Sequence, residues 1–148
     1  MMQPVEEGQG HDTTYALNGS SVWRVFIQGK ILLEGIGASP GIGVGVVKII
    51  ETMKDLPKIK KGDVLVTKMT NPDMVVSMQK SVAIITDEGG MTSHASIVSR
   101  EMGIPAVVGT ASATSVLKEG MKVTVDGNYG KIYEGEVAET QQTEVRPA

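Results

Sequence analysis

The amino-acid sequence predicts a single α/β domain built from many short strands and about three short helices. The chain has 148 residues, which is an ordinary size for one domain with one core. Apolar residues make up 41% and charged residues 21% of the chain, close to the averages of globular proteins. Short runs rich in valine and isoleucine alternate with segments that carry helix start and stop signals, and this alternation indicates the mixed class.

The strands are expected where short β-branched runs are bounded by turn residues. These runs are Val22–Ile27, Val44–Ile50, Val64–Met69, Val82–Thr86, Pro105–Gly109, Val123–Val125 and Lys131–Tyr133. Val82–Thr86 is apolar almost throughout, which is typical of a strand buried on both faces. The turn residues Asp126-Gly127-Asn128 predict that the last two strands form a hairpin.

The helices are expected over residues 72–80, 94–102 and 112–119. Asn71 can cap the first helix, and Pro72 suits its first position. Apolar residues recur at helical spacing after His94, and Gly103 supplies a stop signal before Pro105. The sequence therefore places His94 in the first turn of a helix.

Both ends of the chain are expected to lack regular structure. Residues 1–20 are polar and follow neither the helical nor the strand period, and residues 136–148 have a similar polar composition. We therefore expect a flexible or unassigned segment over residues 1–30, one domain over residues 31–135, and a polar tail or linker stub over residues 136–148.

Composition excludes several classes of function. A net charge of −3 without a basic cluster argues against nucleic acid as a partner. The absence of cysteine excludes disulfides and thiolate metal sites. No signal peptide and no apolar run of about 18 residues is present, so we expect no membrane segment and a cytoplasmic location. Asp87 and Glu88 lack further ligands at metal spacing and are interpreted as turn residues.

The run from Gly89 to Ala95 predicts a site for an anion. A strand that ends in a glycine pair and turns into a helix leaves backbone N–H groups unpaired at the positive helix end. The same helix end disfavours a charged imidazole, so His94 is expected to be neutral and nucleophilic. We predict that His94 carries a phosphoryl group. Its supporting groups are expected to come from Gly89, Gly90, Thr92, Ser93 and Ala95.

The same residues resemble a known family. The segment GGMTSHASIVSR, residues 89–100, is similar to the active-site signature of the phosphoenolpyruvate-utilising enzymes, whose histidine aligns with His94. The likeness is strongest over Lys61–Thr110 and extends over residues 31–135, where the chain resembles the phosphohistidine domain of the phosphoenolpyruvate synthases (pyruvate, water dikinases). This resemblance implies the swivelling β/β/α fold of that mobile domain.

The resemblance also implies a mechanism in which His94 carries a phosphoryl group between two distant active sites. In the family, an ATP-grasp domain transfers the terminal pyrophosphoryl group of ATP to the histidine, AMP leaves, and water removes the outer phosphate. The mobile domain then carries the phosphoryl group to a barrel domain that converts pyruvate to phosphoenolpyruvate. Neither partner domain fits into this chain, so we expect a phosphotransferase that works only with both partners, in cis or in trans. Mg and ATP are implied for the complete enzyme, and no cofactor is expected on this chain alone.

Two other functions are compatible with the sequence. The first is a phosphocarrier with other partners, as in enzyme I of the sugar phosphotransferase system or in a pyruvate, phosphate dikinase. The second is a non-catalytic regulatory module with the same fold, although such a module has no chemical need for His94 at an anion-binding turn.

Two further residues have alternative interpretations. Thr92 aligns with the threonine that regulatory kinases phosphorylate in some dikinases, and it could equally cap the helix. Arg100, two turns after His94, is a candidate for contact with phosphate or a partner, or else a solvated cation.

Overall fold

The computed structural model describes residues 10–17, 21–136 and 139–145. The strands are β1 (Gly10–Leu17), β2 (Ser21–Gln28), β3 (Ile31–Glu34), β4 (Ile36–Ser39), β5 (Ile42–Ile50), β6 (Val64–Thr67), β7 (Ala83–Thr86), β8 (Ala106–Val108), β9 (Lys122–Asp126), β10 (Lys131–Glu134) and β11 (Glu139–Val145). The helices are α1 (Val75–Lys80), α2 (His94–Met102) and α3 (Ala113–Val116), with two 3-10 turns, η1 (Met53–Lys58) and η2 (Pro72–Met74). The α/β class predicted from the sequence is confirmed.

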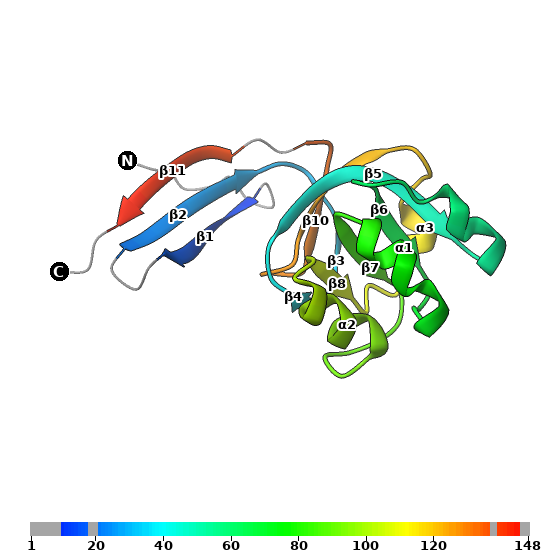
Figure 1. Ribbon diagram of the computed structural model, residues 1–148. Helices are drawn as coiled ribbons and strands as arrows, with labels where there is room; N and C mark the ends of the chain where they lie inside the picture. The colour runs from blue at the N-terminus through cyan, green and yellow to red at the C-terminus, as the bar shows by residue number, and fades with distance from the viewer. Residues whose placement is uncertain (1–9, 18–20, 137–138, 146–148) are drawn as a thin grey trace.

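The strands form two sheets (Figure 1). The larger sheet has eight strands in the order β3-β10-β9-β5-β6-β7-β8-β4, and the smaller has three in the order β1-β2-β11. In the larger sheet β5, β6, β7 and β8 run parallel, whereas β9, β10, β3 and β4 pair antiparallel with their neighbours. The parallel strands therefore end together at one edge, where loops from neighbouring strands can meet.

The parallel strands are buried on both faces because apolar side chains alternate between two cores. Val64 and Val66 of β6 pack into one cluster, which also contains Ala113 of α3. Leu65, between them, packs into a second cluster with Met78 of α1 and other side chains from α2. Helices α1 and α2 thus cover one face of the sheet and α3 packs on the other, which explains the continuous apolar runs of the sequence.

The larger sheet curls so that its two outer strands approach each other. β3 and β4 lie at opposite ends of the strand order but are separated in the chain only by Gly35. The N–H group of Gly35 donates to the carbonyl of Gly130 at 2.8 Å, beside β10. A Cβ atom at Gly35 would lie 2.6 Å from the carbonyl oxygen of Val108 in β8. Only glycine fits at this junction, which holds the sheet in its curled form.

Several predicted helix boundaries are confirmed and others differ. The Asn71 side chain accepts a hydrogen bond from Asp73 N–H at 2.9 Å, so Asn71 caps the η2–α1 segment as predicted. The third helix is shorter than expected, since it ends at Val116. Leu117 is extended and only 1% exposed, so its burial in the core ends the helix.

The expectation that the chain ends lack regular structure is wrong for two segments. Gly10–Leu17 forms β1 and pairs antiparallel with β2, and Glu139–Val145 forms β11 on the other side of β2. Backbone pairing requires no apolar period, which is why polar segments gave no signal of these strands. Residues 1–9, 18–20, 137–138 and 146–148, included in the same expectation, lie outside the described residues.

Candidate functional site

His94 begins helix α2, as the sequence predicted. Ser93, in an extended conformation, caps the helix and accepts a hydrogen bond from the N–H group of Ser96 at 3.4 Å. Gly103 ends the helix in the left-handed region with φ 70°, which also confirms the predicted stop. The alternative that Thr92 is the cap is wrong, because the residue directly before His94 supplies the capping hydroxyl and Thr92 is exposed.

The loop of residues 89–93 is held by the carbonyl group of Gly90. That oxygen accepts from Ser93 N–H at 3.1 Å, from Ser93 Oγ at 2.8 Å and from the buried Ser96 Oγ at 2.6 Å. Gly89 has φ 113°, and a Cβ atom there would lie 2.9 Å from Ser93 Oγ. The glycine at position 89 is therefore required both by its backbone conformation and by the close approach of the capping serine.

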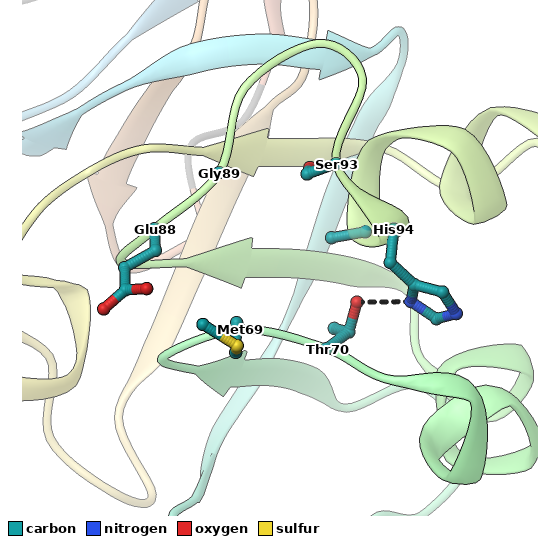
Figure 2. Close-up of a pocket in the computed structure, with 7 residues that line it drawn as sticks. Met69, Thr70, Glu88, Gly89, Ser93 and His94 are labelled. Atoms are coloured by element: carbon teal, nitrogen blue, oxygen red, sulfur yellow. Dashed lines mark hydrogen bonds between the residues drawn. The ribbon is translucent and has the colours of Figure 1, made fainter.

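Thr70 holds the imidazole ring of His94. Its hydroxyl oxygen lies 2.8 Å from Nδ1, and Figure 2 shows this contact reaching across from the loop that follows β6. The parallel pairing of β6 with β7 brings the two loops together, since Thr67 lies opposite Thr86 at the ends of these strands. Thr70 is buried, whereas His94 is partly exposed. The buried threonine therefore holds the ring at Nδ1.

A pocket of about 320 Å³ opens beside the ring. It is lined by Met69, Thr70, Glu88, Gly89, Ser93, His94 and Ala95. Figure 2 shows Glu88 at the end of the pocket away from His94, with Met69 between them. The Glu88 carboxylate lies 3.4 Å from the exposed ammonium group of Lys68. The pocket lies at the carboxyl ends of β6 and β7, the edge at which parallel α/β sheets bind ligands.

Several backbone N–H groups around the ring remain available. Among the described residues, no acceptor contacts the N–H groups of Gly90, Met91, Thr92, His94 and Ala95. The last two belong to the first turn of α2, where N–H groups have no partner within the helix. These groups and the positive end of the helix dipole favour an anion near the loop.

The structure brings some of the sequence-predicted residues together and separates others. Gly89, Ser93 and Ala95 line the pocket with His94, whereas Gly90 and Thr92 lie in the loop outside its lining. Sequence reasoning missed Met69, Thr70 and Glu88; no local signal marks the first two, because they precede His94 by more than twenty residues. Glu88, interpreted as a turn residue, lines the pocket as well.

The described residues contain no convergent metal site. No group of three or more histidine, aspartate or glutamate side chains comes together in the described ranges. No helix in the described part of the chain is long and apolar enough to span a membrane.

Residues 59–130 match the family model described as the PEP-utilising enzyme, mobile domain. A protein of Archaeoglobus fulgidus named "Probable phosphoenolpyruvate synthase" is 60% identical over 115 residues, which are 78% of this chain and 15% of that protein. The phosphoenolpyruvate synthase of Pyrococcus furiosus is 59% identical over 108 residues, 73% of this chain and 13% of that protein. This chain thus corresponds to a small part of the length of these relatives. Aconitase X of Thermococcus kodakaraensis shares the fold, with a TM-score of 0.51 and 20% identity over 70% of this chain and 98% of that one.

Proposed function

Residues 59–130 belong to the mobile-domain family of the PEP-utilising enzymes, and from this premise we propose that the chain is the phosphohistidine carrier of a phosphoenolpyruvate synthase. His94 accepts a phosphoryl group derived from ATP and delivers it to pyruvate. The other parts of the reaction belong to an ATP-grasp domain and a pyruvate-binding barrel, in cis or in trans. We also propose residues 31–135 as the carrier domain, since β3 and β10 pair at its two ends.

The observation that carries this proposal is the 2.8 Å contact between Thr70 Oγ1 and His94 Nδ1. When Nδ1 keeps its proton and donates it to the threonine oxygen, the lone pair of the neutral ring lies on Nε2. Nε2 is then the nucleophile, and Thr70 holds the ring in the tautomer that attack requires. This is the arrangement of a nucleophilic histidine oriented by a second group.

The transfer proceeds in three displacements. Nε2 attacks the β-phosphorus of ATP, the bond from that phosphorus to the oxygen bridging to the α-phosphorus breaks, and AMP leaves with the electron pair. Water then attacks the γ-phosphorus, the bond from that phosphorus to the oxygen bridging to the β-phosphorus breaks, and inorganic phosphate leaves. Finally a base supplied by the barrel domain takes a methyl proton from pyruvate, the resulting enolate oxygen attacks the phosphorus on His94, the N–P bond breaks, and its electron pair returns to Nε2. Mg and ATP are assigned to the ATP-grasp domain of the complete enzyme.

The surroundings of His94 suit a residue that must accept a phosphoryl group and then pass it on. The unpaired N–H groups of the loop and of the first turn of α2 can stabilise negative charge nearby without a permanent cation. A fixed cation in contact with the phosphoryl group would strengthen the phosphorylated state and slow its discharge. Neutral donors therefore suit a group that is passed on.

The test is phosphoryl uptake by the chain in trans. The chain is incubated with the ATP-grasp domain of a phosphoenolpyruvate synthase, Mg and ATP labelled at the β-phosphate, and His94 is examined by mass spectrometry for acid-labile phosphate. We expect label on His94 in the wild type and none in His94→Ala. Thr70→Ser should retain uptake, while Thr70→Val, which keeps the shape but not the hydroxyl, should lose at least about tenfold in rate. Label that never reaches His94 would refute the proposal, and charging by phosphoenolpyruvate with the barrel of enzyme I, but not by ATP, would favour that carrier instead.

A further inference from the structure

Arg100 joins three separate parts of the site. From the last turns of α2, its Nη1 group donates to the carbonyl oxygen of Ala38 in β4 at 3.0 Å. Its Nη2 group donates to the carbonyl oxygen of Met91 in the loop at 2.7 Å. The planar guanidinium is suited to bind two acceptors at fixed angles, which a lysine ammonium group is not. One side chain thus ties the loop to its own helix and to the sheet.

We infer that Arg100 is a positioning residue that fixes the loop of residues 89–93 and, through it, the presentation of His94; its effect on transfer rests on the function proposed above. From the sequence, Arg100 is a candidate for contact with phosphate or a partner, or else a solvated cation. In the structure its Nη1 and Nη2 groups donate to the backbone carbonyls of Ala38 and Met91.

The loop needs such a contact because its sequence gives it little rigidity of its own. Gly89 and Gly90 are adjacent, and glycine has the widest backbone freedom of any residue. A Cβ atom at Gly90 would meet nothing within 4 Å, so no packing limits the backbone there. The hydroxyl groups of Ser93 and Ser96 hold the carbonyl of Gly90, and Arg100 holds the carbonyl of the next residue, Met91.

Fixing these two carbonyls also fixes two N–H groups. Every described peptide bond is trans, and in a trans peptide the N–H group points away from the carbonyl of the preceding residue. The N–H group of Met91 therefore faces away from Ser93 and Ser96, and that of Thr92 faces away from Arg100. Both are among the N–H groups that have no acceptor in the described part of the chain. Arg100 thus contributes to the anion-favouring edge of the loop through the carbonyl group of Met91.

The first measurement uses the unphosphorylated chain and does not depend on phosphoryl transfer. Backbone order parameters of Met91 and Thr92 are measured by ¹⁵N relaxation, together with the ring ¹⁵N shifts of His94. We expect rigid values of about 0.85 in the wild type and values below about 0.6 in Arg100→Ala. Arg100→Lys should resemble Arg100→Ala, because a single ammonium cannot reproduce the two-acceptor geometry. Lys118→Ala, which removes an exposed cation elsewhere, is the control and should leave the loop unchanged.

The second measurement is the rate at which phosphoramidate phosphorylates His94, with release of ammonia. Arg100→Ala and Arg100→Lys should react on the order of tenfold more slowly than the wild type and Lys118→Ala, with all four compared under conditions in which denaturation curves show each to be fully folded. Unchanged order parameters in Arg100→Ala would overturn the inference, as would a full rate in Arg100→Lys. If the wild type accepts no phosphoryl group from any donor, the proposed function fails, and the order parameters still decide whether Arg100 positions the loop.

Discussion

Replacing Gly89 by alanine tests the geometry of the site most directly. Gly89 has φ 113°, a conformation that side chains rarely adopt, and the new Cβ would lie 2.9 Å from Ser93 Oγ and 3.1 Å from Ser93 Cβ. Adopting this conformation costs an alanine about 1–2 kcal/mol. Moving Ser93 aside weakens the cap of α2, which costs about 1 kcal/mol more. We therefore expect a loss of about 2–3 kcal/mol in the free energy of unfolding.

Two other glycines separate these contributions. Gly62 has φ 91° with nothing within 4 Å of its Cβ position, so Gly62→Ala should cost only the conformational part, about 1–2 kcal/mol. Gly90 has open space and no positive φ, so Gly90→Ala should be neutral or up to about 1 kcal/mol more stable.

The measurement is urea denaturation of the three variants and the wild type, with equal slopes required for comparison. From most to least stable, the expected order is Gly90→Ala, then Gly62→Ala, then Gly89→Ala. If Gly89→Ala were no less stable than Gly62→Ala, the contact with Ser93 would carry no cost and the account of the loop would be wrong. Phosphoryl uptake should fall in Gly89→Ala and persist in Gly90→Ala, since only the former displaces the cap next to His94.

Three further predictions concern stability. The N–H group of Ile49 donates to Glu119 at 2.9 Å and holds the pKa of that carboxyl below its ordinary value of 4.5. The resulting stabilisation is present above pH 4.5 and is lost as the pH falls through the lowered pKa. Below about pH 5 the free energy of unfolding should therefore fall less steeply in Glu119→Gln than in the wild type, as measured by denaturation at a series of pH values. Asp63 is 9% exposed and its carboxylate lies 2.9 Å from the ammonium of Lys48. Asp63→Asn should therefore lower the free energy of unfolding by about 2 kcal/mol, and a decrease below about 0.5 kcal/mol in urea denaturation would contradict this. Ala111 has φ 70°, so Ala111→Gly should raise stability by about 0.5–1 kcal/mol, and a lower thermal midpoint would show that the strain is absent.

The features that could be predicted from the sequence are those with local signals. Helix α2 was predicted from apolar spacing and from Gly103, and the buried strands from short β-branched runs. The antiparallel pairing of β9 with β10 agrees with the hairpin expected at Asp126-Gly127-Asn128. Each of these signals lies within or directly beside the element that it predicts, so no knowledge of the tertiary fold was needed.

The features that could not be predicted depend on contacts between distant segments. Thr70 reaches His94 only because β6 and β7 pair in the register that sets Thr67 opposite Thr86. The choice of Ser93 over Thr92 as the cap depends on the loop conformation, since both residues carry a hydroxyl group. The carbonyl partners of Arg100 come from β4 and from the loop, and no spacing along the helix reveals them.

The pairing of β3 with β10 has a consequence for how this domain can be used in larger proteins. Ile31 lies opposite Tyr133, and the N–H group of Glu134 donates to the carbonyl of Lys30 at 2.9 Å, so the backbone enters and leaves the body at neighbouring points. Adjacent strands are only about 5 Å apart. We therefore expect that a host chain can accept residues 31–135, the proposed carrier domain, in one of its surface loops without being stretched. The same proximity means that a short linker across this gap, with new ends opened at the exposed Gly120 turn, should give a circular permutant that still folds.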